Sequence, residues 1–268
     1  MNYQRIITTL FKEPWLVTQE SHDSMVDIVK SDAMREGKDI CGAAVDVPGM
    51  VIEDGIAIIP VAGVMARSLN GWGVGAGMVD MEDITKELQE AEENPDVFAI
   101  LLDIDSPGGT VNGTPELGES VMRVEKPTFS FTSGMACSAA QWLAAAADYS
   151  AATRSAMVGS IGVICTHFSY AEHMKQMGIK PTVLTAGKSK GNGNPYEPLS
   201  DEAKKEIQER VTSMHAEFKS HIRMVRGDID DDYMQGQVLS SMMALEAGLI
   251  DEIVSSKAEL LEKIRAEL

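Results

Sequence analysis

The sequence predicts an α/β protein in which helices flank a mainly parallel sheet. The chain has 268 residues, of which 44% are hydrophobic, so it can bury a sizeable core without disulfide or metal support. Short apolar runs of strand length alternate along it with longer amphipathic stretches, which favours successive βα units. Residues 97–104 (VFAILLDI) are almost continuously apolar, as is typical of a strand buried on both faces of a parallel sheet.

The first expected elements lie before this buried strand. Residues 1–36 alternate apolar and charged positions at helical spacing and predict a helical N-terminal arm. Residues 36–55 mix glycine, proline and acids without a period and indicate a linker. Residues 56–61 (IAIIPV) predict a strand. The glycine-rich stretch 71–77 that follows lacks the Lys-Ser/Thr ending of a phosphate-binding loop, so we do not interpret it as one.

The rest of the chain continues the alternation as a single α/β domain of about 200 residues. The expected elements are, in order, a helix opened by Asp80 and ending before Asn94, a strand at 97–104, a helix at 115–124, a strand at 127–131, a helix at 136–147, strands at 157–164 and 181–184, and a helix at 200–226 capped by Ser200. We therefore divide the chain into an N-terminal arm and linker (1–49), one domain (50–256) and a C-terminal helix (257–268), which we expect to be a docked terminus rather than an interaction helix.

The net charge excludes several classes of partner. The chain carries 23 Lys and Arg against 41 Asp and Glu, a formal charge of −18. Binding to nucleic acid or to anionic lipid needs a basic surface, so neither is expected. No apolar run reaches the roughly 18–20 residues of a membrane span, and no signal peptide is recognisable at the N-terminus. We expect a cytoplasmic protein without a membrane anchor.

The cysteines and histidines indicate neither a disulfide framework nor a metal site. The three cysteines, Cys41, Cys137 and Cys165, have no C-x-x-C spacing, which favours a reducing compartment. The five histidines form no ligand motif, and we expect each to be a solvated or hydrogen-bonded surface side chain. We therefore expect no metal and no cofactor.

A glycine turn follows the buried strand directly. Residues 105–110 read DSPGGT, and this turn falls at the carboxyl end of a parallel strand, where α/β proteins place their sites. Without a Cβ in the way, glycine N–H groups can approach a substrate oxygen closely, as an oxyanion hole requires. Taken alone, the turn is better interpreted as an ordinary strand-to-helix connection.

Two further segments carry chemically suggestive residues. Residues 134–140 (GMACSAA) place Ser138 where a helix opens, either as an N-cap or as a nucleophile on a tight turn. Cys137 is a rival nucleophile by chemistry, but no histidine is suitably spaced to activate it. Residues 186–196 (AGKSKGNGNPY) bring two lysines into an acidic chain, either as a solvated loop or as the source of a neutral amine that accepts a proton from serine.

The order of these motifs, with GSIGV at 159–163, resembles the S49 serine peptidases, the signal peptide peptidase A family. NPY at 194–196 and LFKEPWL at 10–16 are most similar to the head-maturation (prohead) proteases of lambda-type tailed phages. The resemblance covers roughly residues 50–256. It implies a crotonase/Clp-peptidase-like parallel sheet with flanking helices.

The resemblance also implies roles for particular residues. Ser138 matches the nucleophile and Lys190 the general base, because the 52-residue separation is that of the family and Lys188 is out of register. The N–H groups of Gly109 and Ala139 match the oxyanion hole, and Ser160 matches the serine that orients the lysine. The remaining implied residues would bind substrate: Gly108, Ile161 and Gly162.

The activity implied is that of a serine endopeptidase with a Ser–Lys dyad, acting on scaffold, capsid or portal proteins in the host cytoplasm or the procapsid. The family also implies a ring-shaped homo-oligomer in which adjacent subunits share each site. The alternatives are a bacterial signal-peptide-peptidase-like protease without an anchor, and a non-catalytic assembly scaffold. A Clp-type histidine base is not expected because Val163 stands at its position, and a crotonase-type acyl-CoA enzyme would leave the Ser–Lys spacing unexplained.

Overall fold

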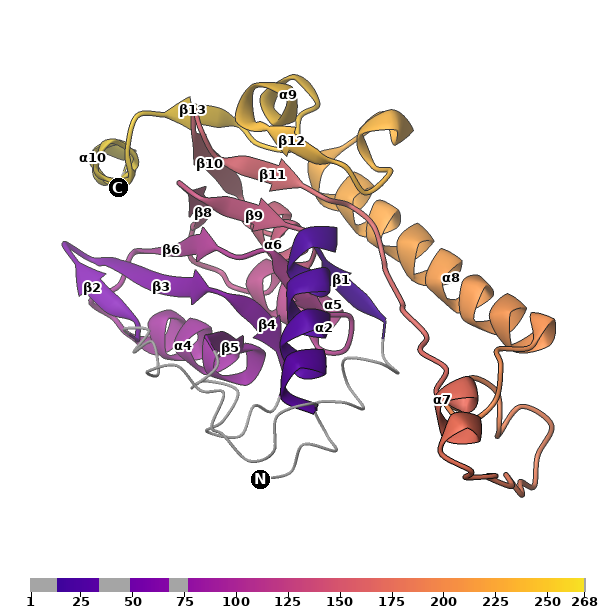
Figure 1. The fold of residues 1–268 in the computed structure, drawn as a ribbon. Helices are drawn as coiled ribbons and strands as arrows, with labels where there is room; N and C mark the ends of the chain where they lie inside the picture. The colour runs from indigo at the N-terminus through magenta and orange to yellow at the C-terminus, as the bar shows by residue number, and fades with distance from the viewer. Residues whose placement is uncertain (1–13, 34–48, 68–76, 268) are drawn as a thin grey trace.

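The computed structural model describes residues 14–33, 49–67 and 77–267, and its centre is a six-stranded sheet (Figure 1). Across this sheet the strands are ordered β13 (Glu252–Val254), β10 (Tyr149–Thr153), β8 (Thr128–Thr132), β6 (Ala99–Asp105), β3 (Ile56–Ala62) and β2 (Val51–Glu53). All neighbours are parallel except β2 and β3, which form an antiparallel pair. The expected parallel α/β architecture is therefore confirmed.

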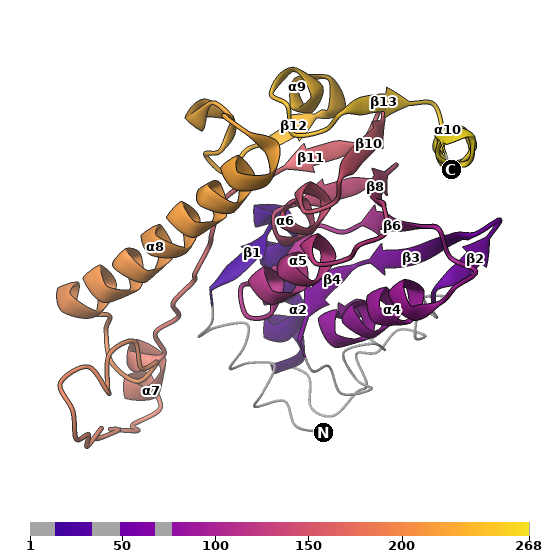
Figure 2. The same cartoon turned by 180° about the vertical axis from the view of Figure 1, so that it is seen from behind.

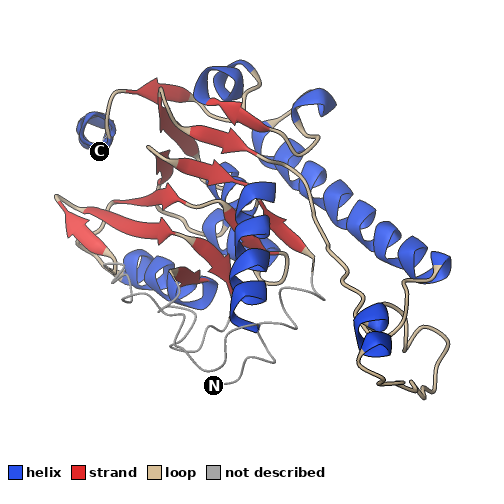
Figure 3. Ribbon diagram, viewed as in Figure 1, coloured by secondary structure: helices blue, strands red, loops and turns tan. Residues whose placement is uncertain are grey.

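Shorter strands form two smaller sheets beside the first (Figure 3). One has the order β1 (Trp15–Val17), β7 (Gly108–Thr110), β4 (Val64–Ala66) and β5 (Met78–Asp80); the other has the order β12 (Val238–Ser240), β11 (Met157–Gly159) and β9 (Met135–Cys137). Four strands of the large sheet each lead within a few residues into a short strand: β3 into β4, β6 into β7, β8 into β9, and β10 into β11. This repeated step carries the strand ends into a second layer, where the glycine turn and Ser138 lie.

The faces of the large sheet are covered by different helices. Helices α4 (Met81–Glu93), α5 (Thr114–Met122) and α6 (Ala139–Ala145) lie on one face, seen in Figure 2, and share a core with alternate residues of β6 such as Ile100 and Leu102. On the opposite face, Leu101 packs with residues of α10 (Lys257–Glu267), including Leu260 and Ile264. Helix α10 is therefore docked on the domain, as expected for the C-terminal region.

Helix α8 (Asp201–Arg226) joins the domain at only one end. Phe218, His221 and Ile222 near its C-terminal end are buried, and Trp142 of α6 packs against both aromatic rings. Its N-terminal half projects away from the sheets together with α7 (Ala171–Gln176) and the loop between the two helices, an arrangement visible from both sides (Figures 1 and 2). Residues 165–200 thus form a projecting arm.

The N-terminal region combines a strand with a helix. Helix α2 (Gln19–Ala33) agrees with the expected helical arm, but β1 precedes it and was not expected. Trp15 and Val17 are apolar residues flanking Leu16, and all three are buried because a sheet edge receives them. A strand of three residues is too short to show a recognisable alternating pattern in the sequence. The glycine-rich stretch 71–77 lies, apart from Gly77, outside the described residues.

Several sequence expectations are corrected by the structure. Residues 136–137 belong to β9 rather than to a helix, because the backbone turns sharply at Ser138, between the end of the strand and the start of the helix. Residues 181–184 form no strand, since none of the described strands lies beside them to pair with. Of the expected strand at 157–164, only 157–159 are assigned to one. Strand β10 was missed. His22 and His221 are buried, contrary to the expectation of surface side chains. The His221 ring is buried because it stacks on Trp142 of α6.

Candidate active site

Ser138 lies at a sharp turn between β9 and α6. Its backbone has φ 56° and ψ −116°, a conformation that residues with a Cβ rarely adopt and that costs of order 1–3 kcal/mol. The Ser138 N–H donates to Gly159 O at 2.7 Å, and its Oγ donates to Gly162 O at 3.4 Å. Strand, strained serine and helix in this order form the geometry of a nucleophile elbow. The serine is fully buried in this single chain.

The glycine turn runs alongside this elbow. Ser106 pairs with Ala136 in a parallel bridge, and the Cys137 N–H donates to Ser106 O at 3.1 Å. A Cβ on Gly108 would lie 3.0 Å from the Cys137 carbonyl oxygen, so only glycine allows this approach. A Cβ on Gly109 would lie 2.0 Å from the Met65 carbonyl oxygen. The turn and the serine expected from the sequence are thus neighbours in space.

Ala139 provides a second backbone N–H beside Ser138. It is the first residue of α6, where N–H groups have no acceptor within the helix, and it is buried. The positive end of the helix dipole favours negative charge at this point. The N–H groups of Gly109 and Ala139 therefore come from two elements that meet around the serine.

Ser160 lies beside Ser138 because β9 and β11 run parallel with Cys137 opposite Gly159. Ser160 also has a positive φ, of 51°, and its N–H donates to Gln237 O at 2.8 Å. It is 6% exposed. Of the residues expected to bind substrate, Gly162 accepts the hydrogen bond from Ser138 Oγ, and Ile161 is fully buried next to it.

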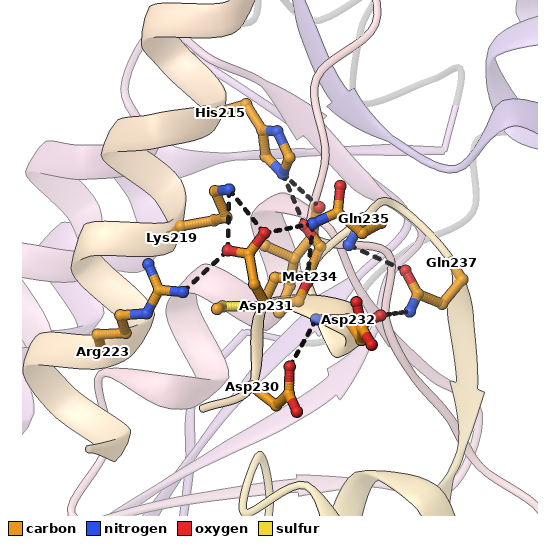
Figure 4. Close-up of polar contacts among 10 residues, drawn as sticks. His215, Lys219, Arg223, Asp230, Asp231, Asp232, Met234, Gln235 and Gln237 are labelled. Carbon is orange, nitrogen blue, oxygen red and sulfur yellow. Dashed lines mark hydrogen bonds and ion pairs between the residues drawn. The ribbon is translucent and has the colours of Figure 1, made fainter. Parts of the chain in front are cut away.

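A polar cluster formed by side chains of α8 and by residues 230–237 contacts the segment that contains Ser160 and Ile161 (Figure 4). His215 of α8 places its Nε2 3.0 Å from Ile161 O and 2.8 Å from Met234 O. These contacts join the helix to the segment after β11 and to the loop before β12. Asp231 binds two side chains of the same helix, Lys219 Nζ at 2.9 Å and Arg223 Nη2 at 2.8 Å. These cations lower the pKa of the Asp231 carboxyl, with the hydrogen bond from Lys219 as the main cause. The cluster therefore fixes α8 against the segment after β11 that carries Ser160 and Ile161.

Cys137 does not suit the role of nucleophile. Its side chain is fully buried, and burial raises the pKa of the thiol to about 12. A thiol attacks as its thiolate, which is scarce at neutral pH when the pKa is so high. Of the two adjacent candidates, Ser138 is the one at the strained turn.

Lys190 and Ser138 lie on different parts of the chain's fold, the lysine in the loop between α7 and α8 and the serine between β9 and α6. Lys190 sits in the projecting arm, in a turn where its N–H donates to Gly187 O at 3.2 Å, and its side chain is exposed. No hydrogen bond or ion pair among the described contacts joins it to Ser138. Glu206 of α8 fixes this loop by accepting from Ser189 Oγ at 2.6 Å and Asn192 Nδ2 at 2.8 Å. The structure therefore gathers the other expected site residues and leaves Lys190 apart from them.

Lys188, the neighbouring lysine, is held as a cation. Its Nζ lies 2.9 Å from Glu202 Oε1, and the hydrogen bond and charge of Glu202 raise its pKa. A general base must be neutral before it accepts a proton. Lys188 is thus the poorer base on chemical grounds as well as on spacing.

Sequence reasoning missed the strand that borders the site. β1 pairs antiparallel with β7, placing Leu16 opposite Gly109. Trp15 also exchanges two backbone hydrogen bonds with Ile164, of 2.8 Å and 2.9 Å. The only signal in the sequence was the motif at 10–16 shared with the family, which gives no position in space.

The described residues hold neither a metal-ligand cluster nor a membrane-spanning helix. No group of three or more His, Cys, Asp and Glu there could hold a metal ion. None of the helices within 14–33, 49–67 and 77–267 is long and apolar enough to cross a bilayer. The free cysteines of this part of the chain are Cys137 and Cys165.

Comparison with known proteins gives matches to peptidases. The model of peptidase family S49 matches residues 121–267, more than half of the chain, and the Clp protease model matches residues 76–165. The chain is 34% identical to the head-tail preconnector protein GP5 of Enterobacteria phage P21 over 76% of its length and 42% of that protein. It is also 34% identical to the capsid assembly protease C of Escherichia phage lambda, over 76% of the chain and 48% of that protein.

The chain thus spans less than half the length of these two relatives. Among solved structures, an enoyl-CoA hydratase from Shewanella pealeana ATCC 700345 superposes with a TM-score of 0.49 at 13% identity, covering 81% of this chain and 72% of that one. The match to the S49 family model is carried by the segment that contains Ser138, Ser160 and Lys190. The chain belongs to peptidase family S49.

Proposed function

We propose that this protein is a serine endopeptidase that uses Ser138 as nucleophile and Lys190 as general base. The observation that carries the proposal is the strained turn at Ser138, flanked by the backbone N–H groups of Gly109 and Ala139. A protein without catalytic function would have no reason to retain a backbone conformation that costs stability at this position. Membership of family S49 supports the same assignment.

In the proposed reaction, the neutral amine of Lys190 takes the proton from Ser138 Oγ, which attacks a peptide carbonyl carbon. The N–H groups of Gly109 and Ala139 stabilise the oxyanion of the tetrahedral intermediate. The Lys190 ammonium then protonates the leaving amine, and an acyl-enzyme on Ser138 remains. Water, deprotonated by Lys190, attacks this ester and releases the acid, which regenerates both side chains.

We propose further that the dyad forms between copies of the chain. Lys190 is exposed on an arm that projects from the domain, and Ser138 is buried in the body. A neighbouring copy could bury the lysine, and burial lowers a lysine pKa towards the neutral form that a base needs. A cyclic arrangement, in which each arm reaches the next body, would complete every site in a ring.

The relatives support a role in phage head maturation. One is named a capsid assembly protease and another a head-tail preconnector protein. We propose that the substrates are scaffold, capsid or portal proteins, and that the protein works in the host cytoplasm or inside the procapsid.

The test combines labelling with turnover. A fluorophosphonate probe should modify Ser138 in the wild-type protein and leave Ser138→Ala unmodified, as shown by peptide mass mapping. A fluorogenic casein assay should show hydrolysis by the wild type and none by Ser138→Ala. Labelling elsewhere, or hydrolysis that survives Ser138→Ala, would contradict the assignment, and absence of both signals in the wild type would favour a non-catalytic assembly protein.

A further inference from the structure

Strand β1 occupies a slot between β7 and the segment around Ile164 that follows β11. On one side it pairs with β7, and on the other Trp15 exchanges backbone hydrogen bonds with Ile164. Both sides of an extended three-residue segment are thus hydrogen-bonded. This is how extended peptides are bound by proteins that add a strand to a sheet.

The carbonyl of Leu16 lies at the proposed oxyanion hole. The flanking contacts, Thr18 N–H to Pro107 O at 3.0 Å and Val111 N–H to Pro14 O at 3.4 Å, set the alternation of the antiparallel ladder. That alternation makes Leu16 and Gly109 a hydrogen-bonded pair, so the Gly109 N–H is directed at Leu16 O.

The same carbonyl lies beside the elbow that carries Ser138. A Cβ added to Gly108 would lie 2.1 Å from Leu16 O and 3.0 Å from Cys137 O, so both oxygens crowd one α-carbon next to the nucleophile. The Leu16 side chain is buried in the main core, whereas Trp15 and Val17 pack on the other side with Val26 of α2. A peptide carbonyl, an N–H donor and the serine turn thus come together at one point.

We propose that residues 14–18 occupy the slot that a substrate peptide uses, with Leu16 in the position of the residue whose carbonyl is attacked. The inference rests on the proposed peptidase function and extends it in two respects. A substrate must displace β1 from the slot before it can reach Ser138. The preferred substrate is an extended peptide with a leucine-sized apolar residue at the acyl position, because Leu16 fills that part of the core.

A disulfide can test whether β1 must move. Trp15 and Ile164 form an isolated, hydrogen-bonded antiparallel bridge. Continuing its alternation by one residue puts Pro14 opposite Cys165 in a non-hydrogen-bonded position, for which Cα atoms are expected about 4.5 Å apart. That separation suits a disulfide. Pro14→Cys should therefore form a bond with the native, partly exposed Cys165 on mild oxidation and lock β1 in place.

The oxidised Pro14→Cys protein should hydrolyse casein at least tenfold more slowly than its reduced form, and dithiothreitol should restore the rate. The matched control is Pro14→Cys combined with Cys165→Ser, whose activity should not respond to oxidation. Locked protein that keeps its rate within twofold would overturn the inference and leave the peptidase assignment intact. Loss of all activity in the wild type would contradict the peptidase assignment instead.

A binding measurement tests the slot without turnover. A fluorescent nonapeptide with the sequence of residues 12–20 (KEPWLVTQE) is added to Pro14→Cys in the Ser138→Ala background, and anisotropy is followed. The reduced protein should bind it, the oxidised protein should not, and the peptide with aspartate in place of leucine should bind at least tenfold more weakly. Equal binding in both redox states, no binding in either, or indifference to the aspartate would each contradict the proposal.

Discussion

The surroundings of Ser138 and of Lys190 differ in almost every physical respect. Ser138 is fully buried and its backbone is strained. Backbone hydrogen bonds join the segments around it, as between Cys137 and Ser106 and between Ser138 and Gly159. Lys190 is exposed on an arm whose local contacts are mainly with the exposed half of α8. The body positions its nucleophile through contacts within one chain, whereas the exposed lysine of the arm would be positioned by contact with another molecule. The difference favours an active site completed by a second copy.

Complementation between inactive variants should give the largest effect. Ser138→Ala and Lys190→Ala should each lower kcat/KM by about 10³-fold or more, because a nucleophile and its base act as a unit. After subunit exchange, an equimolar mixture should recover up to roughly a quarter of wild-type activity, since one random neighbour pairing in four supplies both groups.

The measurement is peptide hydrolysis by the mixture against each variant alone. Exchange of subunits is verified independently by energy transfer between differently labelled copies. No recovery despite proven exchange would show that each chain completes its own site, and the contrast between body and arm would lose its functional meaning.

Side-chain truncation should affect stability differently in the two halves of α8. Phe218 is fully buried against Trp142, with ring centroids 4.9 Å apart, so Phe218→Ala should lower the free energy of unfolding by about 3–5 kcal/mol. Val211→Ala, on the half-exposed stretch of the same helix, should cost about 1 kcal/mol or less. Urea unfolding followed by circular dichroism measures both values, and equal losses would mean that the projecting half of α8 packs as tightly as its docked end.

Glycine substitutions should separate the two regions again. Gly109→Ala places a Cβ 2.0 Å from the Met65 carbonyl oxygen, which forces backbone to move and should cost about 1–3 kcal/mol in stability as well as most of the activity. The atom nearest to a Cβ on Gly191, in the arm, would be the Thr185 methyl at 3.3 Å, so Gly191→Ala should change stability by about 0.5 kcal/mol or less. Thermal melting measures the stability of both variants, and similar shifts in Tm would contradict this difference.

Acidification should have the smallest effect and act on the body. Burial lowers the pKa of His221, which stacks on Trp142, below its ordinary value of 6.5. As pH falls below about 6.5, the unfolded chain takes up a proton that the folded chain does not, so stability declines by up to about 1.4 kcal/mol per pH unit for this group.

Urea unfolding between pH 7.5 and 5 measures this slope. His221→Gln should reduce it without abolishing it, because burial also lowers the pKa of His22. A slope identical to that of the wild type would show that the protonation of His221 does not differ between the folded and unfolded chains, which would contradict the prediction.

Much of the fold could be predicted because its elements are locally encoded. The apolar run around Leu101, the Asp80 cap of α4 and the Ser200 cap of α8 all lie where the sequence indicates them. Strand β9 was taken for helix because alanine-rich sequence favours helix, and its pairing with β11 overrides that preference. Residues 181–184 show the opposite case, in which strand-like sequence finds no partner strand.

The sequence by itself determined the types of group at the candidate site and their order along the chain: a glycine turn, a serine before a small-residue helix and a loop with two lysines. Only the tertiary structure decided which of these meet. Strand pairing over long separations brings Gly109, Ser138 and Ser160 together and places Leu16 at the same point, whereas Lys190 lies in the projecting arm that precedes α8. Local propensities act over a few residues, but the position of a side chain in a site depends on contacts between segments that no local pattern specifies.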